Sequence, residues 1–249
     1  MNSIIIGRNA VMEAIKNGRS IDKILIMKGA EGNALRISAK AKKKHIRVNY
    51  LDRKALDRIA GNENHQGVIA YAAPYEYSDV SEILVLAEER GEEPFIVILD
   101  GIEDPHNLGA VLRSAEGAGV HGVIIARNRA AALTDAAVKV SAGAAEYMLL
   151  SRVTNLARTV DELKKKGVWI WGCDVSGSEY GGSDMTGPVA LVIGNEGRGI
   201  SRLLGEKCDF MVSIPMRGKI NSLNASNAAA VLMYEVDKSV DSSGSDDRL

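Results

Sequence analysis

Beyond residue 94 the sequence alternates short, continuously apolar segments with helical segments, and this alternation restricts the possible folds more than any other feature. The segments Phe95–Asp100, Gly122–Ala126, Val168–Cys173 and Val189–Ile193 lack the regular polar positions of a half-exposed strand. Strands of this kind are buried on both faces, as in a parallel sheet covered by helices. Residues 94–238 are therefore predicted to form an α/β domain with a parallel sheet.

The first 73 residues predict a second, smaller α/β unit, in which short strands alternate with short helices. Residues 74–93 contain an acidic helical stretch, Val80–Glu89, and predict a connector between the two domains. Residues 239–249 are polar and poor in apolar side chains, so a disordered tail is expected there.

The formal net charge of −1 conceals an uneven distribution along the chain. Residues 1–73 carry 14 Lys and Arg but 6 Asp and Glu, whereas residues 74–93 carry one Arg and seven acids. A basic unit on a near-neutral body indicates a polyanionic partner, and nucleic acid is the commonest one. A solvated basic helix around Lys40–Lys44 is the alternative interpretation of the same charges.

Composition argues against several other classes of protein. No apolar run reaches the length of a membrane span, and the amino terminus does not predict a signal peptide. Cys173 and Cys208 match neither a disulfide nor a zinc spacing, which favours a reducing, cytoplasmic location. The four histidines do not have the spacing of metal ligands, so no metal site is expected.

The segment Asp100–Gly119 is the first of three that place polar side chains at a strand end, where ligands bind in open α/β sheets. A helix begins near Asn107, which predicts either a helix cap or a site residue at that position. Arg113 follows six residues later and predicts either a surface side chain or a clamp for a phosphate group.

The second segment, Val189–Gly199, leads a buried strand directly into a glycine-rich loop that contains Glu196. Glycines at such a position allow the backbone to approach a ligand closely. The third segment, residues 214–230, places Ser222 and Asn224 just before a helix, either as caps or as site residues.

In this order, the three segments resemble the motifs of SpoU-type 2′-O-ribose methyltransferases of the SPOUT superfamily. The motif sequences are DPHNLGAVLRSAEGAG, LVIGNEGRGIS and IPMRGKINSLNASNAAAVLMYE, and the likeness extends from Pro94 to Lys238. At the amino terminus, IIIGRNAVMEAI and NHQGVIA resemble the ribosomal-protein-like substrate-binding domain of members that modify large-subunit ribosomal RNA.

This resemblance implies properties that the periodicity of the sequence does not predict. Family members have a trefoil knot at the carboxyl-terminal end of the catalytic domain, and the knot binds S-adenosylmethionine. By motif position, Gly194, Ile214 and Leu223 are expected to contact this cofactor, largely through backbone groups. The resemblance also implies a homodimer, in which Arg113 would reach the cofactor of the other subunit.

The implied reaction is methyl transfer from S-adenosylmethionine to a ribose 2′-hydroxyl, with a guanosine of large-subunit ribosomal RNA as the expected target. Asn107 and Glu196 match motif residues that order the site, and Ser222 and Asn224 match residues beside the cofactor and the ribose. A guanidinium, with a pKa above about 12, is a poor proton acceptor. We therefore expect Arg113 to clamp a substrate phosphate, with Glu196 as the alternative base.

The basic first domain is then expected to dock folded RNA, with Arg8 and Asn9 near the docking face and His65 in the NHQG turn. Four alternatives stay open: a transfer-RNA 2′-O-methyltransferase, a ribosomal methylase that confers antibiotic resistance, a non-catalytic RNA-binding protein of the same fold, and a nicotinamide-dependent dehydrogenase. The dehydrogenase is disfavoured because the G-x-G-x-x-G match at residues 117–122 closes a helix and opens a strand, the reverse of a dinucleotide-binding site.

Overall fold

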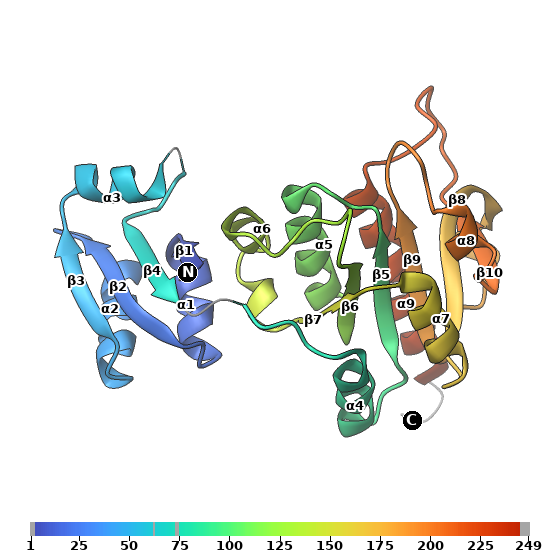
Figure 1. The fold of residues 1–249 in the computed structure, drawn as a ribbon, viewed down its shortest axis with the longest axis horizontal. Coiled ribbons are helices and arrows are strands. Elements are labelled where there is room, and N and C mark those ends of the chain that lie inside the picture. Colours follow the sequence, from blue (N-terminus) through green and yellow to red (C-terminus); the bar gives the residue numbers. More distant parts are fainter. Residues whose placement is uncertain (1–2, 62, 73–74, 245–249) are drawn as a thin grey trace. The chain divides into compact units, whose positions relative to one another are not determined.

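The protein is described by a computed structural model that covers residues 3–61, 63–72 and 75–244 (Figure 1). Contacts between residues divide the chain into two compact units. The first comprises Met1–Glu76 and Leu133–Tyr147, and the second comprises Tyr77–Ala132 and Met148–Leu249. The chain therefore passes between the units more than once.

The first unit is built around a four-stranded sheet. Its elements are β1 (Ser3–Ile6), α1 (Arg8–Lys16), β2 (Ile21–Met27), α2 (Asn33–Lys43), β3 (Arg47–Leu51), α3 (Arg53–Ala60), β4 (Val68–Ala72), α6 (Asp135–Val140) and a 3₁₀ helix, η1 (Ala144–Glu146). The strand order is β1-β4-β2-β3, in which β4 is antiparallel to β1 and β2, and β2 is parallel to β3. The predicted alternation of strands and short helices is thus present.

Alternation of side chains along β2 explains how helices cover both faces of this sheet. Leu25 packs against Leu56 and Ala60 of α3, in one apolar cluster. Its neighbours Ile24 and Ile26 are fully buried as well, on the opposite side of the strand, where α1 and α2 contact the sheet. The first unit therefore has apolar packing on each face of one sheet.

Residues 133–147, which follow β6 in the sequence, group with the first unit by their contacts. The side chain of Asp135 accepts a hydrogen bond of 3.2 Å from the backbone N–H of Ile4. Arg19 and Glu146 form an ion pair of 2.6 Å, with side chains only 9% and 4% exposed. The expected catalytic domain, residues 94–238, included this segment, because a charge pair 127 positions apart leaves no pattern in the sequence.

The second unit is a six-stranded, wholly parallel sheet with the order β10-β8-β9-β5-β6-β7. These strands are β5 (Phe95–Asp100), β6 (Gly122–Ala126), β7 (Leu149–Val153), β8 (Trp169–Glu179), β9 (Val189–Gly194) and β10 (Phe210–Ser213). The helices are α4 (Val80–Arg90), α5 (Pro105–Gly117), α7 (Leu156–Lys164), α8 (Arg202–Gly205) and α9 (Ala225–Gly244), with a 3₁₀ helix, η2 (Tyr180–Gly182). The expected parallel sheet is confirmed.

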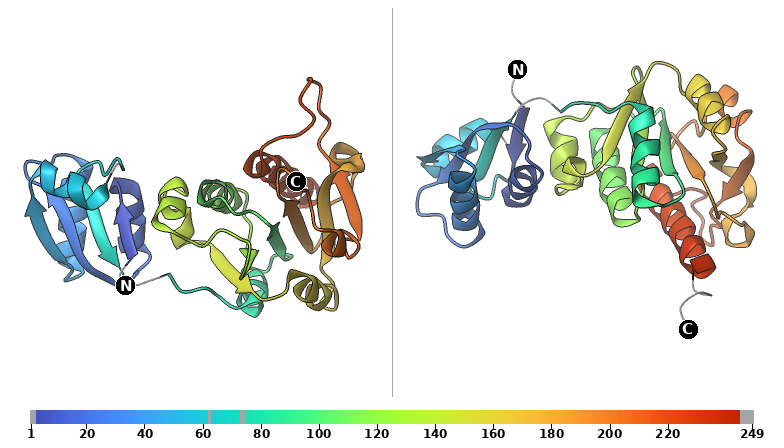
Figure 2. Two further views of the ribbon diagram at one scale, coloured as in Figure 1. Left: turned by 45° about the horizontal axis from the view of Figure 1, so that its top comes forward. Right: turned by 90° about the horizontal axis from the view of Figure 1, so that it is seen from below.

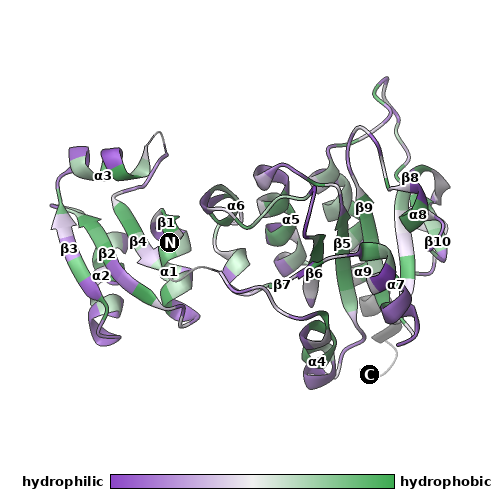
Figure 3. Cartoon of the chain, viewed as in Figure 1, coloured by the Kyte–Doolittle hydropathy of each residue, from purple (hydrophilic) through white to green (hydrophobic). Residues whose placement is uncertain are grey.

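Helices cover this sheet as the apolar strand sequences predict (Figure 2). Ile83 of α4, Val160 of α7 and Leu204 of α8 share one buried cluster with Ile96 and Ile98 of β5. Helices α5 and α9 pack against each other, and α9 also contacts β9. Strands β5 and β9 are coloured as almost entirely apolar in Figure 3, in agreement with burial on both faces.

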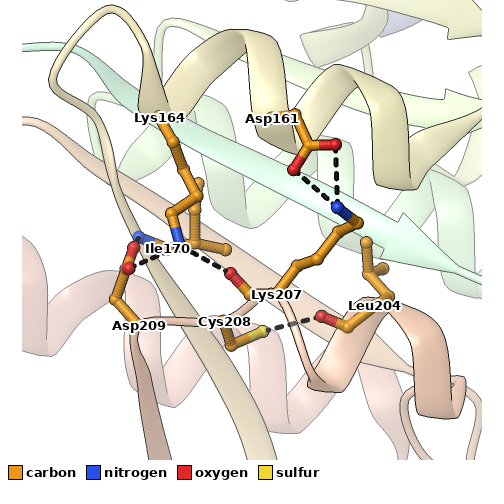
Figure 4. A network of polar contacts seen from close by, with 7 residues as sticks. All are labelled: Asp161, Lys164, Ile170, Leu204, Lys207, Cys208 and Asp209. Carbon is orange, nitrogen blue, oxygen red and sulfur yellow. Dashed lines mark hydrogen bonds and ion pairs between the residues drawn. The ribbon is translucent and has the colours of Figure 1, made fainter.

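A polar network fastens α7 to the segment between α8 and β10 (Figure 4). The ammonium group of Lys207 lies 2.6 and 2.7 Å from the two carboxylate oxygens of Asp161. Lys164 forms a 2.6 Å ion pair with Asp209, and the other oxygen of Asp209 accepts a hydrogen bond from the backbone N–H of Ile170. These contacts join three segments at the amino ends of β8 and β10.

Three boundaries differ from the expectations. The expected connector, residues 74–93, contains α4, whose Ile83 is fully buried in the core of the second unit. Strand β8 continues to Glu179, because β10 pairs with it on both sides of a register shift. Helix α9 continues to Gly244, beyond the expected start of the tail at residue 239, since a helix that is already formed extends at low cost. Residues 245–249 of that tail lie outside the described residues.

Candidate active site

The carboxyl ends of β5 and β9 are neighbours in the sheet, with Asp100 opposite Gly194. From β5 the chain continues through β6 and β7 toward one edge, whereas β9, β8 and β10 lie on the other side of β5. The strand order therefore reverses between β5 and β9, and open α/β sheets bind ligands at such a point. The three motif segments of the sequence converge here.

Three predicted site residues form a closed set of hydrogen bonds at this point. The side-chain amide of Asn107 donates to Glu196 Oε1 at 2.6 Å. The amide of Asn224 donates to the same oxygen and to Asn107 Oδ1, both at 3.0 Å. Each residue comes from a different motif, so these bonds tie α5, the loop after β9 and the start of α9 together.

Helix ends determine how these side chains are presented. Asp104, not Asn107, is the N-cap of α5, since its carboxylate accepts the backbone N–H of His106. Asn107 lies inside the first turn, 9% exposed, and its amide is free to reach Glu196. Asn224 both caps a helix and joins the hydrogen-bonded set. Its side-chain oxygen accepts the backbone N–H and the hydroxyl of Ser226 at the start of α9, while its amide nitrogen donates to Glu196 and Asn107.

The loop after β9 is held in shape by its own backbone. Asn195 and Gly199 exchange two backbone hydrogen bonds of 3.1 and 2.7 Å, which close a tight loop around Glu196. The amide of Asn195 also donates to the carbonyl of Gly101, and Asp100 accepts the backbone N–H of Ser201. The carboxylate of Glu196 is thus placed by contacts on both sides of the loop.

Two glycines mark points where chain segments cross without room for a side chain. A Cβ atom on Gly194 would lie 2.2 Å from the carbonyl carbon of Gly199 and 2.4 Å from the nitrogen of Ile200. A Cβ atom on Gly177 would lie 2.6 Å from the backbone of Met211 and Val212. The loop after β9 and strand β10 therefore press directly against neighbouring backbone.

A pocket opens beside the three loops, within the second unit. Its lining includes the three residues expected to contact the cofactor, Gly194, Ile214 and Leu223, together with Glu196 and Ser222. Arg113 is absent from this lining; its side chain is exposed and makes no hydrogen bond or ion pair with any described residue. The single chain therefore assembles the pocket and the polar triad but does not bring Arg113 to the pocket lining.

The pocket offers both apolar and polar contacts, as an adenosyl group with a charged amino-acid chain requires. Apolar surface comes from Val175, Ile193, Met216 and Ala228, and carboxylates and amides line the remainder. Backbone groups of residues 215–223 make no hydrogen bond to other described residues, so their N–H and C=O groups are available to a polar ligand. A purine ring needs the apolar wall, and a charged amino-acid chain needs the polar groups and the unpaired backbone.

Sequence reasoning missed Cys173 and Asp174, which line the same pocket from the middle of β8. Burial, and then the neighbouring Asp174 carboxylate, raise the pKa of the Cys173 thiol to about 11. This thiol is therefore a neutral wall of the pocket and not a nucleophile. No motif marks these positions, because β8 reaches the site only through its pairing with β9.

The residues expected to contact RNA lie around another pocket, in the first unit. Arg8 and His65 line it, and the guanidinium of Arg8 donates to the backbone carbonyl of Gln66 at 2.7 Å. His65 is 6% exposed; its Nδ1 accepts the N–H of Gly67, so Nε2 carries the proton and donates to Asp57 at 2.9 Å. The imidazole thus shapes the turn, while Asn9 is exposed beside Arg8.

Among the residues that the structure covers, no group of His, Cys, Asp and Glu could hold a metal ion. None of the helices in the same residues is long and apolar enough to cross a membrane.

Comparison with known proteins identifies both parts of the chain. A family model described as the SpoU rRNA Methylase family matches residues 94–234, and one described as RNA 2′-O ribose methyltransferase substrate binding matches residues 4–78. A protein of Bacillus subtilis (strain 168), YacO, named in the TrmH family of tRNA/rRNA methyltransferases, is 47% identical over 93% of this chain and 94% of its own.

Solved structures agree with this result. The SpoU methyltransferase AviRb of Streptomyces viridochromogenes, in complex with the cofactor AdoMet, superposes with a TM-score of 0.80 at 26% identity. That match covers 95% of this chain and 90% of AviRb. The TrmH/SpoU tRNA modifying enzyme of A. aeolicus superposes with a TM-score of 0.57 at 25% identity. That match covers 66% of this chain and 85% of the A. aeolicus enzyme.

Proposed function

Since this chain belongs to the SpoU rRNA Methylase family and is an S-adenosylmethionine-dependent RNA 2′-O-ribose methyltransferase, we propose that its target is a guanosine of large-subunit ribosomal RNA. The observation that carries the catalytic part is the Asn107–Glu196–Asn224 triad at the lip of a pocket that fits the cofactor. The proposed ribosomal target is supported by the first unit.

The substrate-binding unit supports ribosomal RNA over transfer RNA. It matches its own family model and carries 14 Lys and Arg against 6 Asp and Glu in residues 1–73. The tRNA modifying enzyme of A. aeolicus matches about two thirds of this chain, whereas AviRb matches nearly all of it. A large basic docking unit suits a long, folded RNA whose phosphates it can contact at several points. A transfer RNA remains the second candidate.

S-adenosylmethionine, when bound, supplies a methyl group already activated by its sulfonium centre. The residues of this chain then have to align a ribose hydroxyl and accept its proton. Alignment of two reactants alone can lower a barrier by about 7–11 kcal/mol. Glu196 Oε1 is occupied by the amides of Asn107 and Asn224, while Oε2 receives no hydrogen bond from the described residues and is available to the ribose hydroxyl.

Arg113 has a different task in this proposal. Because its exposed guanidinium has no partner among the described residues, it is free to bind a phosphate of the RNA with its planar set of donors. In a homodimer it would do so at the pocket of the other subunit, which agrees with its absence from the pocket of its own protomer. Glu196 is then the group that accepts the proton.

The trefoil knot belongs to the same proposal. The backbone crossings at Gly194 and Gly177 are close enough to be the contacts of a chain threaded through its own loop. Such threading would hold residues 194–199 and 214–223 around the cofactor with little freedom to move. Backbone groups that are fixed before binding lose less entropy when the cofactor binds.

The test is a comparison of substrates. The purified protein is incubated with S-adenosylmethionine and, separately, with unmodified large-subunit ribosomal RNA and unmodified transfer RNA, and 2′-O-methylated positions are mapped. We expect one methylated guanosine in the ribosomal RNA, and its loss in Arg113→Ala. Methylation of transfer RNA alone would overturn the proposed target but not the chemistry.

A further inference from the structure

A second groove lies at the carboxyl ends of β6 and β7 and shares residues of the loop after β9 with the cofactor pocket. Its lining includes Ala126, Arg129, Asn155, Arg198 and Leu203, all in the second unit. We name it the Arg129 groove. No part of the reaction described above uses it.

The Arg129 groove and the cofactor pocket have a common wall. Asn195 and Gly199, which are joined by two backbone hydrogen bonds, line both of them. Glu196 is at the tip of the loop that they close. A nucleotide strand that passes over this loop would therefore have one nucleotide at Glu196 and the next in the groove.

The groove has charged groups suited to a phosphate. Arg129 makes no hydrogen bond or ion pair with any described residue, and its side chain is exposed. Arg198 forms an ion pair of 3.4 Å with Glu103, but both side chains are exposed, so the pair contributes little stabilisation and Arg198 can exchange it for a phosphate. The lining contains one carboxylate, Asp100, whose Oδ2 is occupied by the backbone N–H of Ser201. Positive charge therefore predominates.

Backbone strain concentrates at the same residue. Arg129 has φ of 53°, in the left-handed region that costs an arginine about 1 kcal/mol or more. A glycine would adopt this conformation freely, so the stability of the fold does not explain an arginine here. In this conformation Arg129 lines the groove.

The remaining walls are apolar. Leu156, Ala157 and Leu204 line the groove, and Leu203 stands at its edge with 54% of its surface exposed. An exposed leucine beside two arginines presents the two surfaces that a nucleotide needs: an apolar contact for the base and cations for the phosphate. A protein partner would bind the two arginines well only if it carried acidic side chains, whereas every nucleotide carries a phosphate.

We propose that the Arg129 groove binds the nucleotide adjacent to the methylated one in the RNA substrate, with its base against Leu203 and its phosphate on Arg129. This inference rests on the proposed function, because it needs an RNA strand bound at Glu196. The groove then fixes the register of the strand, so that one ribose, and not its neighbour, faces Glu196.

The test uses the full chain and a large-subunit ribosomal RNA transcript. Arg129→Gly removes the guanidinium and relieves the strain, so its melting temperature should equal or exceed that of the wild type. Lys165→Ala, at the far end of α7, is the control for loss of one positive charge. Dissociation constants for the transcript are measured by filter binding over a range of NaCl concentrations, alongside calorimetric binding of S-adenosylmethionine.

We expect Arg129→Gly to weaken RNA binding and raise KM for RNA about five- to tenfold, with kcat and cofactor affinity within about twofold. The slope of log Kd against log salt should fall by about 0.7–0.9, the value for one phosphate contact. Leu203→Ala should weaken RNA binding about threefold without changing this slope.

RNA affinity of Arg129→Gly equal to that of Lys165→Ala would overturn the inference. A change in oligomeric state with unchanged RNA affinity would do the same, and would assign the groove to contact between copies of the chain. If the wild type binds the transcript but methylates none of it, the proposed target is wrong. The comparison of RNA affinities between the variants still shows whether the Arg129 groove binds RNA.

Discussion

The carboxylate of Glu196 accepts a 2.6 Å hydrogen bond from the side-chain amide of Asn107, 89 positions away in the sequence. The amide of Asn224 donates to the same oxygen. Two side-chain amides and, at 3.5 Å, the backbone N–H of Ala225 donate to one carboxylate oxygen, and the other oxygen has no partner among the described residues. The site therefore depends on residue 107 being an amide rather than an acid.

Asn107→Asp should show this dependence directly. A carboxylate at residue 107 would face the carboxylate of Glu196, and the two cannot share the short contact unless a proton lies between them. We expect kcat at about pH 8 to fall at least tenfold, and the ratio of variant to wild-type activity to rise at lower pH. Asn107→Ala is the control, since its ratio should not change with pH. A pH-independent ratio for both variants would contradict the assigned contact.

Gly194→Ala and Gly197→Ala form a matched pair within one loop. A Cβ atom at residue 194 would lie 2.2 Å from backbone, whereas one at residue 197 would meet only the Asn195 side chain at 3.5 Å. We expect the first variant to lose binding of S-adenosylmethionine and several degrees of melting temperature, and the second to retain both. Calorimetry and thermal denaturation measure these quantities, and equal behaviour of the two variants would rule out the close crossing at Gly194.

The parallel sheet was predictable because its central strands are apolar along nearly their whole length, as in β5 and β9. The triad could be anticipated only through the resemblance, since Asn107, Glu196 and Asn224 each have an ordinary role as a cap or loop residue. Which role applies depends on contacts between distant segments. Asp104 caps α5, so the side chain of Asn107 is free to bind Glu196. The local sequence does not determine which of the two residues caps the helix.

His121 should make the stability of the second unit depend on pH. Burial lowers its pKa from the ordinary 6.5, and this effect outweighs the raising effect of its hydrogen bond to Glu92. Since the folded form binds the proton more weakly than the unfolded form, stability is full above about pH 6.5 and decreases as the pH falls below it. His121→Gln should lose less stability than the wild type between about pH 7.5 and pH 5.5 in urea denaturation. Equal losses would contradict the burial effect.

Asp209→Ala tests the network that fastens α7. This change leaves the ammonium of Lys164 and the backbone N–H of Ile170 without their partner. We expect the free energy of unfolding to fall by about 1–3 kcal/mol. Arg158→Ala breaks the Arg158–Glu162 pair on the same helix, whose side chains are 80% and 55% exposed, and should cost less than about 0.5 kcal/mol. Denaturant titration of the two variants compares these costs, and a cost for Asp209→Ala no larger than the control would contradict the role of the network.

The extent of the first unit could not be predicted from local patterns. Residues 133–147 join it through pairs such as Arg19 with Glu146 and Lys139 with Glu63, which are distant in sequence. Each of these side chains alone is typical of a solvated surface. Charge along the sequence indicates that a region is basic, but it does not show which charges neutralise one another in the folded chain.

Formation of a 2′-O-methylated nucleoside tests the central claim most directly. Ribosomal RNA that lacks the modification is incubated with the enzyme and S-adenosylmethionine carrying a labelled methyl group, then digested to nucleosides and separated. We predict label in 2′-O-methylguanosine with the wild type, and a decrease of at least about tenfold with Asn107→Ala. Label on a base, or full activity without Asn107, would contradict a site in which Glu196 and its two amide donors align a ribose hydroxyl.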